Sequence, residues 1–473
     1  MNNLLFFQKG IPVLVALLLC CTNCLLAQDN YRAVLTGRTQ DNPILTSATG
    51  EISVEINDNQ LIVSGTFRQL SSNVLSEGIN IHASLAGQTG DVVFGLIPNL
   101  NTDQRSGRLD AALNTFTITP AQAAAFSTRQ FYVNIATAEY PEGEIRGQIL
   151  PDGLTLFYTN AYGSNHTHHV ISTGEASVFV EIVSSDEMVV TGSFDNLNSP
   201  ITTAHLQLGV PGEDGAATVT LTPTTNDQLS GTFEVENNTF EIDLDLIIAL
   251  GERRVYLNVV SEEHTAGELR GQLVPAEAGT VFRTRLSGTN VVPSVLTQAT
   301  GDLLAEVYGD SLMILSGTYR NLSSALRDDP VSRTGIFEGL AGQMGNSTLQ
   351  LNPTANSATA GAIEATRNIY LLADEESDLL FNRALHISLA SEAHPEGEVR
   401  GQLVPEAHAF FTGALSGLFQ VPPSRSEAIG NTMVELRGTD MILSGSFQKL
   451  GDNLAANNGI SSGLAGSNGP AQF

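Results

Sequence analysis

The string Gly143-Glu144-Ile145-Arg146-Gly147-Gln148 returns as Gly267-Glu268-Leu269-Arg270-Gly271-Gln272 and again as Gly397-Glu398-Val399-Arg400-Gly401-Gln402. The copies are 124 residues apart (143 to 267) and then 130 residues apart (267 to 397), and a proline follows each one, at Pro151, Pro275 and Pro405. This spacing is the length of a domain and is too long for a solenoid repeat, which runs about 20 to 50 residues. The sequence therefore predicts a tandem array of similar domains.

A second landmark indicates where each repeat begins. A glycine that opens an alternating strand recurs at Gly50, Gly174, Gly301 and Gly430, which gives four beginnings for three closing motifs. We expect domains over residues 28–152, 153–276 and 277–406, with short, semi-rigid spacers. We expect residues 407–473 to be a fourth domain that is cut short, because half a domain would leave an open sheet edge and an uncovered apolar face.

Within each repeat the hydrophobic period is two. After Gly50, the apolar residues Ile52, Val54 and Ile56 alternate with polar ones, which is typical of a half-buried strand. A polar turn and a second strand ending in Ser64-Gly65-Thr66-Phe67 complete a hairpin, and the same order recurs in the later repeats.

A short helix is predicted near the end of each complete repeat. It is clearest where Thr119 and Pro120 form a helix start, and the counterparts begin near Asp243 and Asp374. Many short strands with turns and one small helix favour an all-β fold. We therefore predict tandem antiparallel β-sandwich domains of the immunoglobulin-like or Greek-key type, each with one short helix.

The N-terminus has the pattern of a secretory signal peptide. Lys9 precedes an apolar run over residues 11–21, and Leu25-Leu26-Ala27 offers a cleavage site after Ala27. The run is too short for a membrane span, which needs roughly 20 apolar residues, and no later stretch approaches that length. We expect residues 1–27 to be removed and the protein to be secreted, to an extracellular or cell-surface location.

The three cysteines, Cys20, Cys21 and Cys24, all lie in the predicted signal peptide. The exported protein would therefore fold without disulfides and could not use cysteine catalysis. A domain of about 125 residues can bury some two thirds of its unfolded surface, so a hydrophobic core can replace disulfides.

The chain is strongly acidic. Its formal charge is −28, removal of Lys9 would make it −29, and Lys449 would then be the remaining lysine. Nucleic acids and anionic membranes are poor partners for such a surface. The acidity serves solubility outside the cell, or alternatively a cationic ligand.

The motif and its surroundings resemble a known family. The strings Tyr140-Pro141-Glu142-Gly143-Glu144 and His394-Pro395-Glu396-Gly397-Glu398, the Ser-Gly-x-Phe hairpins and the Gly-x-x-Gly loop are similar to the chordin-type (CHRD) domain, also found in secreted bacterial proteins. The resemblance covers residues 31–473. It implies extracellular β-rich modules and no firm molecular activity. We expect the partner to be an extracellular protein or polysaccharide.

The motif's glutamate and arginine lie two residues apart on a strand, so their side chains share one face. Two interpretations are open for Glu144 with Arg146 and for their counterparts: a ligand-binding pair, or a structural ion pair that locks the last strand. The glycines Gly143 and Gly147 fit a tight entry and a close backbone approach. We expect the motif positions to be structural.

The densest histidine cluster is His166-Thr167-His168-His169, and His205 lies in the same repeat. Together these four histidines could supply the nitrogen ligands of a zinc or copper site. The alternative is a solvated loop, since no cysteine or ligand spacing supports a metal. Acidic stretches at 327–329 and 374–378 lack the spacing of a calcium loop.

No enzyme motif emerges from the sequence. Gly309-Asp310-Ser311-Leu312 spells a lipase-like string, but the first repeat has Asn57-Asp58-Asn59-Gln60 at this hairpin turn. We therefore expect a secreted, non-enzymatic multidomain protein that needs no cofactor and acts as a binding or surface-associated structural module. The alternative is a metal-dependent, sandwich-fold enzyme that uses His82, His205 and residues 166–169.

Overall fold

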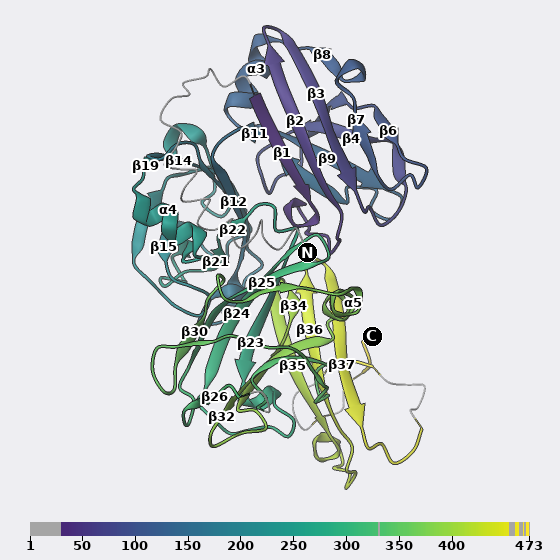
Figure 1. The fold of residues 1–473 in the computed structure, drawn as a ribbon, viewed down its shortest axis with the longest axis vertical. Helices are drawn as coiled ribbons and strands as arrows, with labels where there is room; N and C mark the ends of the chain where they lie inside the picture. Colours follow the sequence, from purple (N-terminus) through teal and green to yellow (C-terminus); the bar gives the residue numbers. More distant parts are fainter. Residues whose placement is uncertain (1–29, 330–331, 454–458, 463–466, 468–469, 473) are drawn as a thin grey trace. The chain divides into compact units, whose positions relative to one another are not determined.

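The computed structural model describes residues 30–329, 332–453, 459–462, 467 and 470–472 (Figure 1). The predicted signal peptide, with Cys20, Cys21 and Cys24, lies outside these residues. The chain divides into two compact units, residues 1–282 with 303–318 and 363–374, and residues 283–302 with 319–362 and 375–473. Across the described residues, no helix has the length and apolar character needed to span a membrane.

The first sheet has 11 antiparallel strands in the order β5-β4-β9-β10-β1-β2-β3-β7-β6, with β11 paired to β1 and β8 to β3. Its strands are β1 (Asn30–Thr36), β2 (Thr49–Asn57), β3 (Gln60–Arg68), β4 (Val74–Ala83), β5 (Asp91–Gly95), β6 (Pro98–Leu100), β7 (Gly107–Leu109), β8 (Thr115–Thr117), β9 (Phe131–Thr137), β10 (Ile145–Gln148) and β11 (Leu150–Pro151). Helix α3 (Pro120–Ser127) completes what we call the first module.

The second module repeats this strand order. It consists of α4 (Leu244–Gly251) and β12 (Thr155–Tyr162), β13 (Glu175–Ile182), β14 (Glu187–Asp195), β15 (Ile201–Leu208), β16 (Ala217–Leu221), β17 (Pro223–Thr225), β18 (Gly231–Phe233), β19 (Thr239–Glu241), β20 (Val255–Ser261), β21 (Leu269–Gln272) and β22 (Val274–Pro275).

The third module, with a 12-stranded sheet, follows the same order of elements. It consists of α5 (Asp374–Phe381) and β23 (Thr280–Ser287), β24 (Thr300–Tyr308), β25 (Leu312–Arg320), β26 (Leu326–Arg327), β27 (Gly335–Glu338), β28 (Ser347–Leu349), β29 (Thr354–Ala355), β30 (Gly361–Ile363), β31 (Ile369–Leu371), β32 (Leu385–Ser391), β33 (Val399–Gln402) and β34 (Val404–Pro405). A fourth sheet has three strands, β35 (Ala409–Ser416), β36 (Ile429–Arg437) and β37 (Asp440–Gln448).

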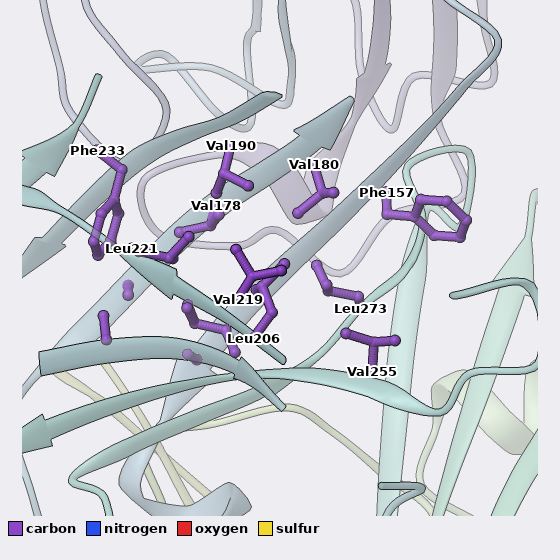
Figure 2. Packing of buried hydrophobic residues seen from close by; sticks show 14 of the residues in the cluster. Phe157, Val178, Val180, Val190, Leu206, Val219, Leu221, Phe233, Val255 and Leu273 are labelled. Carbon is purple, nitrogen blue, oxygen red and sulfur yellow. The ribbon is translucent and has the colours of Figure 1, made fainter. Parts of the chain in front are cut away.

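The predicted antiparallel β-sandwich is confirmed, and the structure adds that both layers belong to one curled sheet. Alternation explains this fold, because Ile52 and Val54 point into the core while Glu51 and Ser53 stay exposed. In the second module, Val178 and Val190 face Leu206 across the core (Figure 2). A core of this size lets each module fold without a disulfide.

The local elements form as the sequence predicts. At the start of α3, the Thr119 side chain accepts a hydrogen bond from the Gln122 amide, and the Gln122 side-chain oxygen accepts one from the Thr119 amide. The two bonds together form a capping box. One landmark needs correction: Gly50 pairs with Phe67, but in the second module Ala176, not Gly174, pairs with Phe194. Val178 is the equivalent of Ile52, so the second module has two more residues between Gly174 and Val178 than the first has between Gly50 and Ile52.

The fourth sheet exposes the face that forms the core in the first module. Val63 and Phe67 of β3 are 0% and 2% exposed, whereas Leu443 and Phe447, at the same register of β37, are 52% and 53% exposed. These side chains meet water because no second layer covers them among the described residues.

We predict that residues 407–473 expressed alone do not fold, because no second layer of strands would cover the apolar face that carries Leu443 and Phe447. Circular dichroism against temperature is expected to show no cooperative transition, whereas residues 28–276 are expected to melt cooperatively. A sharp transition from the 407–473 fragment would contradict the predicted domain boundary.

Candidate functional site

In each module the carboxylate of the motif glutamate accepts several hydrogen bonds from other segments of the chain, and we call this arrangement the hub. Glu144 is fully buried just before β10, and its carboxylate accepts hydrogen bonds from Thr46 Oγ1 (2.8 Å), from the Ser71 amide (2.8 Å) and hydroxyl (2.9 Å), and from Thr137 Oγ1 (2.9 Å). These donors come from three segments that are distant in sequence. A buried carboxylate needs such donors, and here they tie the segments to the closing strand.

The second module repeats this hub. Glu268 accepts from Ser172 Oγ (2.6 Å), the Asn198 amide (2.7 Å) and Ser261 Oγ (2.5 Å). The agreement with the first module extends to the segments that supply the donors.

In the third module, Glu398 accepts from Thr297 Oγ1 (2.6 Å), the Ser323 amide (2.8 Å) and hydroxyl (2.9 Å), and Ser391 Oγ. Burial alone would raise the pKa of Glu398, but the hydrogen bonds from Ser391, Thr297 and Ser323 outweigh it and lower the pKa. The side chain is therefore held as a carboxylate.

The motif arginine uses other partners. The Arg146 guanidinium lies 3.4 Å from the centre of the Tyr132 ring and donates to the Leu85 carbonyl at 3.0 Å. Arg270 lies 3.7 Å from the Tyr256 ring centre. Glu144 and Arg146 therefore have separate partners in the described structure: the carboxylate accepts from hydroxyl and amide donors, and the arginine donates to the loop over residues 85–90.

The remaining motif residues fit the same buried arrangement. Gln148 Nε2 donates to the Ser84 and Arg129 carbonyls at 2.8 and 2.6 Å. Gly143 has φ +141°, and a side chain on Gly147 would meet the Val34 carbonyl oxygen at 2.4 Å. These positions therefore require glycine.

A repeated contact that the sequence did not reveal joins adjacent modules. Arg129 directly follows α3 and its cap, and has a left-handed backbone with φ 60°. Its Nε and Nη2 atoms donate to the two carboxylate oxygens of Glu181 at 3.0 and 3.2 Å, on β13 of the next module. Both side chains are buried, and desolvation raises the pKa of Glu181 even though Arg129 opposes that rise.

The same pair occurs twice more, each time inside one compact unit. Arg253 binds Glu306 through two bonds of 2.8 Å, and Arg383 binds Glu435 at 2.6 and 3.0 Å. Like Arg129, Arg253 and Arg383 have φ 60°, at a position where helices usually place glycine. We call these three Arg–Glu pairs the junction pairs.

A second contact accompanies each junction pair. Ser193 Oγ donates to the Ala86 carbonyl at 2.7 Å, Thr318 Oγ1 to the Pro211 carbonyl at 2.9 Å, and Ser446 Oγ to the Ala341 carbonyl at 2.6 Å. Each donor lies in the Ser/Thr-Gly-Ser/Thr hairpin strand of one module. Each acceptor lies in the Gly-x-x-Gly loop of the module before it, which we call the glycine loop (residues 86–90, 211–215 and 341–345). Within each compact unit, side-chain contacts of the same two kinds therefore join residues of adjacent modules.

The first module has the same residues without these partners. Glu55 and Thr66 occupy the register of Glu181 and Ser193, and both are exposed. The sequence signal for the junctions was present, since an arginine follows each helix and a glutamate recurs in each second strand. The sequence alone could not show which glutamates are buried, because the exposed Glu55 occupies the same position in its strand as the buried Glu181.

The predicted histidine ligands lie in different surroundings. His166 is buried, His168 Nδ1 lies 3.0 Å from the Thr167 hydroxyl, and the two ring nitrogens of His205 lie 3.1 and 3.2 Å from threonine hydroxyls. His169 follows in the same loop, and His82 stacks on Tyr132. Within the residues that the structure describes, no three His, Cys, Asp or Glu side chains gather as metal ligands would.

Curled antiparallel sandwiches with a buried closing motif, repeated in tandem, define a class of multimodule β proteins. The sequence comparisons place the chain more narrowly. The CHRD domain pattern matches residues 31–149, 157–273 and 282–403, and the chain therefore belongs to the CHRD domain family.

One curated relative with this similarity is "Chordin" of Xenopus laevis. It is 24% identical to the chain over 274 residues, which are 52% of this chain and 26% of chordin. The alignment thus spans about a quarter of the length of chordin.

Proposed function

We propose that this chain is a secreted, non-enzymatic CHRD-domain protein that acts as an extracellular binding or surface-associated structural module. Domains over residues 28–152, 153–276 and 277–406 and a partial domain over 407–473 form its array. The observation that supports this proposal is the burial of the repeated polar residues. Glu144, Arg146 and Gln148 and their counterparts are at most 4% exposed and bind within their own module.

Side chains buried to this degree cannot contact a macromolecular ligand, so the repeated residues serve the scaffold of each module. Binding is then left to the loops that differ between modules, each held by the strands of its own module. The ligand class that fits is an extracellular protein or polysaccharide. The acidic chain, with a formal charge of −28, disfavours nucleic acid.

The binding role can be tested with the full chain on a sensor surface, against extracellular polysaccharides and secreted proteins. We expect saturable binding to one ligand, and exchange of exposed loops between modules should change affinity while the melting temperature stays constant. Turnover of a ligand without stable binding would contradict the proposal.

Metal analysis tests the alternative of a zinc or copper enzyme. We predict that the purified chain, loaded with zinc or copper and then dialysed, retains much less than one metal per chain, because the histidines do not converge. His168→Ala should leave this low content unchanged, as should the control His264→Ala. One equivalent of metal that is lost in His168→Ala would overturn the non-enzymatic assignment.

A further inference from the structure

A cavity of about 250 Å³ with both polar and apolar lining residues lies within the second compact unit, between the glycine loop of the third module and the fourth sheet. Its walls include Thr289, Asn290, Thr412 and Asn431, and Arg400 is the one charged residue among those that line it. The volume is many times the roughly 15 Å³ that a single water molecule needs. The cavity can therefore admit a small polar ligand.

Three side chains fill the equivalent space between the first two modules. Arg38 stacks on the Tyr158 ring at 5.0 Å and donates to the Tyr158 carbonyl at 3.1 Å. Asn160 donates to the Arg38 carbonyl at 3.0 Å and accepts from the Tyr158 hydroxyl at 2.5 Å.

The junction between the third module and the fourth sheet has smaller residues at these three positions. Tyr158 pairs with Phe179, and Thr412 pairs with Met433 in the same register. By that register Ala414 replaces Asn160, and Thr289 of η5 (Gly288–Asn290) replaces Arg38 of η1 (Gly37–Thr39). The change from large to small side chains opens the cavity.

The arginine beside this cavity also lacks the carboxylate that pairs with its counterpart in the second module. Arg270 Nη1 lies 3.0 Å from the Asp214 carboxylate. In the glycine loops, Asp214 of Pro211-Gly212-Glu213-Asp214-Gly215 becomes Met344 of Ala341-Gly342-Gln343-Met344-Gly345.

Arg400 is 4% exposed and donates to the Gln343 and Leu340 carbonyls, which occupies two of its five N–H donors. None of the ion pairs within the described part of the chain includes it. Burial and then the charge of Arg333 lower the pKa of Arg400 to about 10, so it remains a cation at neutral pH. A buried cation without a counter-charge, beside an open cavity whose lining includes threonine and asparagine side chains, attracts an anion.

We propose that this cavity binds a small oxyanion, a carboxylate or sulfate group, on the Arg400 guanidinium, with the threonine and asparagine side chains around it as further polar partners. This site goes beyond the proposed function and holds whether or not the array binds a larger ligand. The anion can be free in solution or belong to an acidic sugar.

Equilibrium dialysis of the full chain against labelled inorganic sulfate, and separately against labelled glucuronate, at fixed ionic strength tests the site. We expect saturable binding of at least one probe with one site per chain. Tighter binding of sulfate would identify a free inorganic ion, and tighter binding of glucuronate an acidic sugar. Absence of saturable binding for both probes would overturn the proposal.

Three variants assign the site. Arg400→Gln should weaken binding at least tenfold, and Thr412→Tyr, which restores a large residue of the first junction, should do the same. Met344→Asp changes an exposed loop residue and supplies the missing carboxylate, so it should abolish binding even if Arg400→Gln fails to fold. The exposed Arg425→Gln is the control and should bind as wild type. Unchanged binding in Met344→Asp and Thr412→Tyr would refute the assignment.

Discussion

Replacement of Arg253 by methionine is expected to lower the free energy of unfolding by about 3–5 kcal/mol, because it leaves a buried carboxylate without its counter-charge. Glu306 has a side chain that is 0% exposed and receives two bonds from Arg253. Glu306 raises the pKa of Arg253 despite an opposing effect of burial, as expected for a charge held by its partner. Chemical denaturation followed by circular dichroism measures the change.

The next residue provides a matched control. Arg254 forms an ion pair with Glu252, and the two side chains are 43% and 51% exposed. Arg254→Met should therefore change stability by no more than about 0.5 kcal/mol. The double variant Arg253→Met/Glu306→Met should recover part of the loss, since it removes the unpaired charge. Equal effects of Arg253→Met and Arg254→Met would contradict a buried junction pair.

The second large effect is expected for the motif glutamate. Glu398→Ala should cost about 3–5 kcal/mol, because it removes the acceptor of one buried amide and three hydroxyls and leaves a cavity. Glu396→Ala is the control, since Glu396 is exposed in the same turn. Glu398→Gln retains the shape and should lie between them. A melting temperature of Glu398→Ala equal to that of Glu396→Ala would refute the hub.

The same carboxylate makes a pH prediction. The pKa of Glu398 in the folded protein lies below its ordinary value of 4.5. Its stabilisation is therefore complete above the unfolded pKa and is lost as the pH falls through the lowered folded pKa. Below about pH 4.5, the wild-type melting temperature should decline more steeply than that of Glu398→Gln. Parallel curves would show that Glu398 has no lowered pKa.

Most of the fold was predictable because its signals are local. The period-two strands, the hairpin turns and the caps at Thr119 and Asp243 depend on residues within a few positions of one another. The hub of Glu144 was not predictable, because its donors Thr46 and Ser71 lie 98 and 73 residues away. The alternation of the strand predicts that Glu144 and Arg146 share one face, but it could not reveal that the two side chains have different partners.

The junction pairs escaped prediction for two physical reasons. Arg129 and Glu181 are separated by 52 residues and belong to different modules. The arginine also occupies a left-handed position after the helix, where sequence rules expect glycine. A glutamate on the polar face of a strand is predicted to be exposed to solvent unless a preceding module is known to cover that face. Glu55 is exposed, whereas Glu181 at the same position is buried.

The cavity at Arg400 could not be predicted either. It requires the comparison of three positions that come from separate segments, where Thr289, Thr412 and Ala414 replace larger residues. None of the three substitutions is unusual by itself. Only the register of the sheets brings them around one arginine.

The most direct test of docked modules is a double-mutant cycle on Arg129 and Glu181 in the full chain. The single variants Arg129→Met and Glu181→Met and the double variant are compared with wild type by chemical denaturation. A direct junction pair predicts a coupling free energy of at least about 1 kcal/mol between the two substitutions. Additive effects within about 0.5 kcal/mol would show that the two residues do not interact, and would contradict the docking of neighbouring modules.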